Sequence, residues 1–267
     1  MNHAHLIIEH KIPKVVIGCI DSFSKVSGKG IEKLKNEGID VSVGVLEKEC
    51  LELNKRFFTF HNKKRPYIIL KWAETKDGFI DVDRTSNLPG GKTNIDNWIT
   101  SPLSKKLVHK WRSEEAGIMV ATNTAINDNP SLNVREWSGK NPLRVVLDLN
   151  NRLPKSLNLL DGSTPTLIFT SNKLTNKVNI EYYKIDVSSN VINQVLEVLH
   201  QKNIQSIIIE GGKQLLQSFI DNNTWDEARV FVGEKRFVNG LTAPQLNNTS
   251  TTEQAIGTDK LSIYNND

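Results

Sequence analysis

The chain has 267 residues, of which 38% are hydrophobic and 24% are charged, and its formal net charge is +4. This composition is typical of a globular protein, either one large domain or a domain of about 200 residues with a smaller piece attached. No apolar run approaches the length of a membrane span, and no secretory signal pattern is present, so we expect a cytoplasmic protein. The charge is too small and too evenly spread to indicate a nucleic-acid partner.

The only cysteines are Cys19 and Cys50, which form no C-x-x-C pair. A disulfide framework or a cysteine-rich zinc site is therefore not indicated. We expect no bound metal and a reducing compartment.

The first part of the chain, residues 1–63, is predicted to contain two short strands, 15–21 and 41–45. A helix is expected at 30–38, and another runs from about residue 47 until the basic segment 61–66, which ends in proline. That segment marks the expected domain boundary, with a second domain at 64–267. About 60 residues form only a small core, so the first piece is expected to need packing contacts beyond its own residues.

Glycines between the first strand and the first helix suggest a dinucleotide-binding loop, because Gly28 and Gly30 precede a helix start. The match is poor, since Lys33 occupies the third glycine position and Gly28 comes seven residues after Asp21, where a Rossmann turn would be tight. A plain glycine-rich loop is favoured, and a Rossmann-type dehydrogenase stays as an alternative.

In the second part, strands and helices alternate, which predicts an α/β domain with a mostly parallel sheet that binds ligands at the carboxyl ends of its strands. Helices are expected to begin near residues 102, 191 and 215, and the polar stretches 81–94, 122–135 and 239–258 are expected to be loops. The predicted strands are 67–73, 118–121, 143–147, 166–170, 180–185, 206–209, 228–232 and 261–264.

Charged residues interrupt this pattern at informative places. Thr100 or Ser101 can cap the helix that begins at Pro102, and Arg112 follows its apolar stripe, at the buried edge. Lys71 lies within a strand that is otherwise apolar, where a lysine is usually paired or used; the alternative is a strand-end lysine that reaches water.

A second informative turn follows strand 206–209, which stops at Glu210, Gly211 and Gly212 before a helix begins. Backbone amides at that helix start could hold a phosphate, and the missing glycine side chains would let it come close. Alternatively, the glycines only make the turn from strand to helix.

Four motifs in order carry a family resemblance: 70–78 (LKWAETKDG), 98–100 (WIT), Thr124 with 128–130 (DNP), and 210–212 (EGG). Together they resemble the reductase domain of the bifunctional riboflavin-biosynthesis deaminase/reductase family. Residues 1–63 resemble the back half of that family's deaminase domain, whose front half is missing. A zinc deaminase needs H-x-E and P-C-x-x-C motifs, and neither is present, so we expect neither zinc nor deamination.

The resemblance implies a dihydrofolate-reductase-like fold and reduction of the ribosyl group of 5-amino-6-(5-phosphoribosylamino)uracil with NADPH. Lys71, Asp128 and Glu210 match family positions around the reacting sugar, as the catalytic groups that could transfer a proton or polarise the carbonyl or imine. The positions that match substrate contacts are Asp96, Arg112, Leu132, Arg135 and Glu210, although serine is expected at position 96. Those that match cofactor contacts are Glu74, Trp98, Thr124, Asp128, Leu149, Gly211, Gly212 and Lys213.

The resemblance also implies a homodimer that acts on a phosphorylated pyrimidine and has no membrane partner. NADPH is implied by the family alone, since no particular residue indicates the 2'-phosphate. A binding-only pseudo-enzyme is the alternative, encouraged by the shortened first domain. Against it, the reductase part keeps all its charged site positions.

Overall fold

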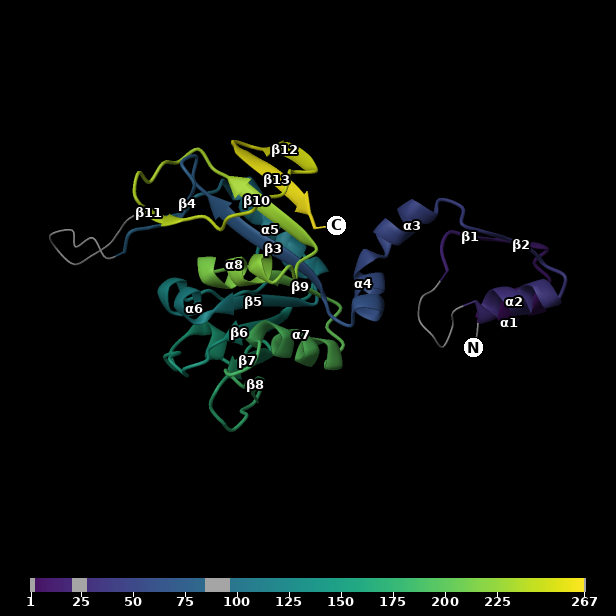
Figure 1. The fold of residues 1–267 in the computed structure, drawn as a ribbon, viewed down its shortest axis with the longest axis horizontal. Coiled ribbons are helices and arrows are strands. Elements are labelled where there is room, and N and C mark those ends of the chain that lie inside the picture. Colours follow the sequence, from purple (N-terminus) through teal and green to yellow (C-terminus); the bar gives the residue numbers. More distant parts are fainter. Residues whose placement is uncertain (1–2, 21–27, 85–96, 267) are drawn as a thin grey trace. The chain divides into compact units, whose positions relative to one another are not determined.

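The computed structural model describes residues 3–20, 28–84 and 97–266. The chain divides into two compact units, Met1–Tyr67 and Ile68–Asp267. Their elements are labelled in Figure 1.

The described residues of the first unit form two parallel strands and four helices. Strand β1 (Lys14–Ile17) pairs with β2 (Asp40–Val43). One continuous helix was expected from residue 47, and this prediction is wrong, because the chain leaves helical geometry at Asn54. The Asn54 side chain donates to the Cys50 carbonyl, a local bond that competes with helix continuation. The helices are α1 (His3–Glu9), α2 (Lys29–Asn36), α3 (Glu47–Leu53) and α4 (Lys55–Lys63).

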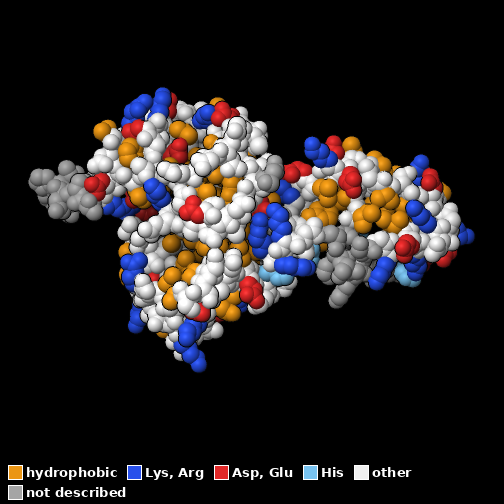
Figure 2. Space-filling model, viewed as in Figure 1, with side chains coloured by type: hydrophobic (Ala, Val, Ile, Leu, Met, Phe, Trp, Pro, Cys, Tyr) orange, Lys and Arg blue, Asp and Glu red, His pale blue; other side chains and the backbone are white. Residues whose placement is uncertain are grey.

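The core of this unit is small. Its buried apolar side chains in the described part are Ala4, Leu34, Phe60 and Tyr67. On the two strands, Val16 and Val43 are 57% and 38% exposed. Hydrophobic side chains also reach the surface over β1 in Figure 2. This limited burial agrees with the expectation that so short a piece builds little core by itself.

The second unit is built on a nine-stranded sheet of order β12-β13-β10-β3-β9-β5-β6-β7-β8 (Figure 1). Strand β10 pairs in parallel with β3, and β9, β5, β6, β7 and β8 form a parallel run. Strand β13 pairs antiparallel with both β10 and β12. The predicted α/β class with a mostly parallel sheet is confirmed. The strands are β3 (Tyr67–Glu74), β5 (Gly117–Ala121), β6 (Leu143–Leu147), β7 (Thr166–Thr170), β8 (Ile180–Lys184), β9 (Ser206–Ile209), β10 (Glu227–Val232), β12 (Thr252–Ile256) and β13 (Asp259–Asn265).

Helices cover both faces of this sheet. Helices α7 (Val191–Gln201) and α8 (Lys213–Asp221) bury their apolar stripes in the main core, with Leu70 and Trp72 of β3. Because side chains alternate along a strand, Lys71 points to the opposite face. On that face α5 (Pro102–Glu114) places Trp111 against Phe231, with ring centroids 5.5 Å apart. No described helix is both long and apolar enough to cross a membrane.

Three stretches predicted as loops contain regular structure. The short helix α6 (Thr122–Asp128) lies within 122–135, and β4 (Phe79–Val82) pairs antiparallel with β11 (Gly240–Thr242). Strand β12 lies within 239–258. These elements are short, α6 and β12 are mostly polar, and the side chains of β12 are almost all exposed. Apolar periodicity, which was the basis of the predictions, gives no signal for such elements.

Candidate active site

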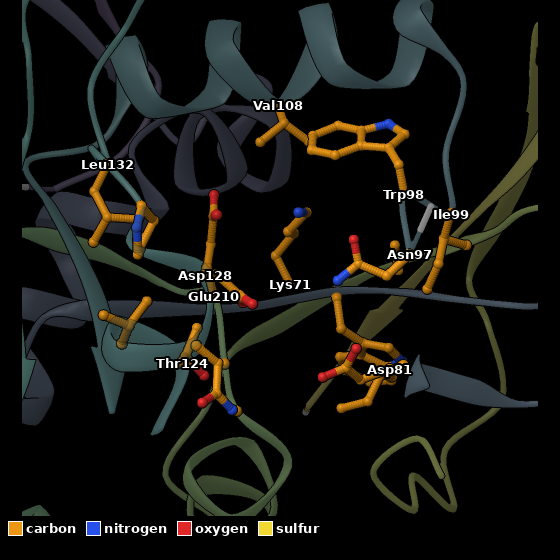
Figure 3. Close-up of a pocket in the computed structure, with 18 of the residues that line it drawn as sticks. Lys71, Asp81, Asn97, Trp98, Ile99, Val108, Thr124, Asp128, Leu132 and Glu210 are labelled. Atoms are coloured by element: carbon orange, nitrogen blue, oxygen red, sulfur yellow. The ribbon is translucent and has the colours of Figure 1, made fainter. Parts of the chain in front are cut away.

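A cavity of about 670 Å³ lies where β3, β5 and β9 reach their carboxyl ends, and the loops after β5 and before α5 complete its wall. Figure 3 shows Lys71 reaching into the middle of this space, between Trp98 on one side and Asp128 and Leu132 on the other. The predicted site residues that line the cavity are Lys71, Trp98, Arg112, Thr124, Asp128, Leu132, Arg135, Glu210, Gly211 and Gly212.

Lys71 is half-buried on β3, and within the described part of the chain its ammonium has no hydrogen bond or ion pair. Burial lowers the pKa of Lys71 from its ordinary value; the nearby Glu210 carboxylate opposes this shift and Arg112 adds to it. A lysine in this state can exchange a proton more readily than one on the surface.

Glu210, directly after β9, forms an ion pair with Arg112 from α5. The Arg112 Nε donates to Glu210 Oε1 at 3.0 Å and Nη2 donates to Oε2 at 2.6 Å, a two-pronged contact. The two side chains are only 12% and 8% exposed. The third nitrogen, Nη1, donates to the Asn133 carbonyl at 3.4 Å. Arg112, predicted as a substrate contact, thus has its guanidinium engaged with protein groups.

The contact with Arg112 keeps Glu210 ionised. Burial would raise the pKa of Glu210, but the charges of Arg112 and Lys71, together with the hydrogen bonds from Arg112, outweigh it and lower the pKa to about 2. Glu210 therefore stays ionised at any working pH and is a poor proton donor.

Asp128, at the end of α6, has the opposite tendency. Burial raises its pKa, and so does the neighbouring Asp81, whereas Arg84 lowers it; the net direction is upward. Arg84 joins the two carboxylates, donating to Asp81 and to Asp128 at 2.6 Å each. Sequence reasoning missed Arg84 and Asp81, because both fall in a polar stretch predicted as a loop.

The turn between β9 and α8 is shaped by glycine. Gly211 has φ of 122°, a region that favours glycine, and a Cβ at Gly212 would stand 3.0 Å from the Thr124 hydroxyl. The Ala121 amide donates to the Gly211 carbonyl, so this turn is bonded to the end of β5. The result is a narrow cradle that a side chain would fill.

Trp98 enters the cavity from the segment before α5. It is 51% exposed, and the Lys105 ammonium lies 5.1 Å from its ring centre. A large aromatic face left open at a cavity can stack on a flat ligand ring.

His109 is a second residue that the sequence analysis missed. It lines the cavity from α5, is 1% exposed, and its Nδ1 accepts a hydrogen bond from the Arg135 backbone amide at 3.1 Å. Burial lowers the pKa of His109, and the charges of Arg112 and Arg135 lower it further, while Glu136 and Glu210 oppose them. A histidine on an otherwise ordinary helix gave no signal in the sequence.

Three predicted cofactor residues are not in the cavity wall. The Glu74 carboxylate accepts from the Trp72 indole at 2.8 Å, the Leu149 carbonyl accepts from Ser171, and the Lys213 ammonium bonds to the Thr242 hydroxyl. Their cofactor contacts stay predictions. Asp96 lies outside the described residues. Among those residues, no group of three or more His, Cys, Asp and Glu side chains could hold a metal ion, and the expected absence of zinc stays a prediction.

The fold and the cavity define an α/β domain of the nucleotide-binding type, with its site at the carboxyl ends of a parallel sheet. Residues 66–259 match the family described as the RibD C-terminal domain, and the chain belongs to this family.

Relatives agree with this assignment. The riboflavin biosynthesis protein RibD of Aquifex aeolicus is 36% identical over 252 residues, covering 92% of this chain and 68% of the relative. That of Bacillus amyloliquefaciens is 33% identical, covering 91% and 65%. The chain thus spans about two thirds of each.

Solved structures show the same fold. A Thermotoga maritima protein described as a diaminohydroxyphosphoribosylaminopyrimidine deaminase/5-amino-6-(5-phosphoribosylamino)uracil reductase has a TM-score of 0.85 and 32% identity, covering 98% of this chain and 74% of its own. The yeast riboflavin biosynthesis reductase Rib7 has a TM-score of 0.61 and 16% identity, covering 80% and 99%. The expected dihydrofolate-reductase-like α/β domain is confirmed, whereas the proposed deaminase origin of residues 1–63 stays a prediction.

The buried pair yields a prediction about acid stability. Glu210→Gln leaves Arg112 buried without a counter-charge, which should reduce the free energy of unfolding by about 3–5 kcal/mol at pH 7. In wild type the Glu210 pKa is about 2 when folded, against a reference value of 4.5. Between these values the unfolded chain binds more protons, so wild type should lose roughly 3 kcal/mol as pH falls through this window.

The variant has no carboxyl at this position, so its stability should fall less and the gap to wild type should narrow below pH 4.5. Urea unfolding at a series of pH values measures this gap. Glu181→Gln is the control, because Glu181 is 46% exposed in its pair with Lys202 and should contribute less than about 1 kcal/mol. A gap that stays constant down to pH 2.5 would contradict the assigned charge of Glu210.

Proposed function

We propose that this chain uses NADPH to reduce the ribosyl group of 5-amino-6-(5-phosphoribosylamino)uracil to a ribityl group, a step of riboflavin biosynthesis. The observation that carries the proposal is the half-buried Lys71, which has no hydrogen bond or ion pair within the described residues, beside the ionised Glu210 at the strand ends of a RibD C-terminal domain. The name of the Thermotoga maritima relative describes this same reduction.

The reaction needs a proton as well as a hydride. The bond between the sugar's C1' and its ring oxygen breaks, the ring oxygen takes a proton to become a hydroxyl, and hydride adds to C1' of the resulting protonated imine, which becomes the neutral amine. NADPH supplies the hydride. Glu210, with a pKa of about 2, stabilises positive charge that develops at the imine and does not donate the proton. Lys71 and Asp128, whose pKa values are shifted towards neutrality, are the groups suited to proton transfer.

The cavity also fits a nicotinamide nucleotide. The cradle of Gly211 and Gly212 beside Thr124 accepts a phosphate oxygen where a side chain would block it. Trp98 offers an open ring at the cavity edge. The arrangement supports a nicotinamide cofactor, and the choice of NADPH over NADH follows family usage.

The substrate is placed on the other side, along Leu132 and Arg135. The Arg135 guanidinium is exposed, and within the described residues it bonds only to the Asn133 side chain, so it is available to a sugar phosphate. Arg112 borders the same region, but we assign it mainly to holding Glu210, since its nitrogens face Glu210 and Asn133.

For residues 1–63 we propose kinship with part of the deaminase domain. The sequence contains neither deaminase zinc motif, so we attribute only the reduction to it. The competing proposal is a pseudo-enzyme that binds without turnover. Following NADPH absorbance in a single turnover with the aminouracil substrate tests the two: loss of absorbance with formation of the ribityl product supports the reductase, and a folded protein that leaves NADPH unchanged supports the pseudo-enzyme.

Substitutions of the site residues should differ in whether they mainly change KM or kcat. Arg135→Ala should mainly raise KM, by about 1.5–3 kcal/mol in binding terms, because a phosphate clamp acts in ground and transition states alike. Lys71→Ala and Glu210→Gln should mainly lower kcat, on the order of a hundredfold or more. A substrate without its phosphate should bind wild type weakly and be nearly indifferent to Arg135→Ala. Equal weakening of both substrates would show that Arg135 is not the phosphate ligand.

A pair of glycine variants locates the cofactor. Gly212→Ala and Gly212→Val place a Cβ 3.0 Å from the Thr124 hydroxyl and should weaken NADPH binding at least about tenfold. Gly30→Val is the matched control, because a Cβ there meets nothing within 4 Å. Fluorescence titration of NADPH gives Kd, and circular dichroism checks folding. If Gly30→Val abolishes binding and the Gly212 variants do not, the Rossmann-type alternative is correct.

The chain is also proposed to be a homodimer, on family grounds and because apolar side chains such as Val16 remain exposed. Light scattering over a range of concentrations should give twice the 30.1 kDa chain mass. A mass that stays at one chain at every concentration would exclude the dimer.

A further inference from the structure

The loop from Pro130 to Arg135 forms one wall of the cavity and has an unfavourable backbone. Leu132 has φ of 46°, a left-handed conformation that costs a non-glycine residue about 1–3 kcal/mol. Its side chain is nonetheless 2% exposed, packed in the smaller core cluster. Such a loop keeps its shape only if other contacts hold it.

Helix α5 supplies two of those contacts, one turn apart. Arg112 donates to the Asn133 carbonyl, and His109 accepts the Arg135 amide. The Arg112 contact is long, at 3.4 Å, and that side chain is already committed to Glu210. The His109 contact, at 3.1 Å, is the one that fixes the backbone from which the Arg135 side chain extends.

We propose that His109 is a positioning residue that holds Arg135 in place through Nδ1 and turns its protonated Nε2 towards the cavity. Because Nδ1 accepts a backbone N–H, it carries no proton, so the single proton of the neutral ring is on Nε2. A charged ring would bring two N–H groups face to face, beside the guanidinium groups of Arg112 and Arg135. The carboxylates of Glu136 and Glu210 are the opposing charges near it.

This inference rests on the proposed function, since it predicts recognition of the substrate phosphate through Arg135. Asparagine places an amide oxygen near the position of Nδ1, whereas glutamine places one near Nε2. His109→Asn should therefore keep the bond to the Arg135 amide, and His109→Gln and His109→Leu should lose it.

Steady-state kinetics on the full chain separates these variants. With the phosphorylated substrate, KM should rise about tenfold for His109→Gln and His109→Leu, stay within about threefold of wild type for His109→Asn, and change more than kcat. With the substrate lacking its phosphate, the three variants should resemble wild type. Equal losses for Asn and Gln, or equal losses on both substrates, would reduce His109 to a packing residue and overturn the proposal.

An NMR measurement that needs no turnover tests the His109 tautomer independently of the proposed function. The ¹⁵N chemical shifts of His109, assigned by comparison with His109→Gln, should show a neutral ring protonated at Nε2 at pH 7. A ring protonated at Nδ1, or charged, overturns the inference even if the enzyme is active. If wild type shows no reduction but the Nε2 tautomer is found, the proposed function fails while the bond from His109 to Arg135 stands.

Discussion

The two-pronged contact between Arg112 and Glu210 is the constraint on which the site depends. It joins the last turn of α5 to the end of a central strand, and both side chains are nearly inaccessible. A buried ion pair is weak grounds for stability, because removing two charges from water costs about as much as their attraction returns. Its value here is chemical, since it keeps a carboxylate ionised at a fixed place beside Lys71.

The ionisable side chains of the cavity therefore differ in how strongly they favour their charged forms. Glu210 is held as an anion, the burial of Lys71 opposes its positive charge, and Asp128 is shifted in favour of its neutral form. The two carboxyl groups have similar ordinary pKa values and would otherwise titrate over the same pH range. Their surroundings separate them, because the Arg112 guanidinium holds the pKa of Glu210 down whereas burial raises that of Asp128. Acid and base roles can then coexist at one pH.

The main architecture could be predicted because its signals are strong and local. Buried parallel strands appear as apolar runs, and all eight strands predicted in the second domain are present, while the Ser101 cap and Pro102 mark the start of α5. Lys71 and Glu210 were found because a charge within or at the end of such a run is conspicuous. Short exposed elements such as β12 and α6 have no apolar periodicity, and they were missed.

The sequence also could not show which side chains interact with one another, because these pairings depend on three-dimensional contacts. The sequence placed Arg112 and Arg135 in the same region but could not show that Arg112 is occupied by Glu210, 98 positions away. It also gave no reason to select His109, whose importance arises from a bond to a backbone amide. Motif resemblance pointed to positions that match ligand contacts in a family, Arg112 among them, and it gave no indication of the contacts that these residues make with one another.

Helix α5 carries two residues that hold other parts of the site in place, His109 and Arg112. Its outer end is fixed by Asp259, which accepts hydrogen bonds from the Ser101 amide and the Ser104 hydroxyl. Its inner end is fixed by Trp111, which stacks on Phe231. His109 lies between these two fixed points, and Arg112 directly follows the second. One helix thereby contributes both the guanidinium that keeps Glu210 ionised and the imidazole that holds the loop carrying Arg135, through two separate contacts.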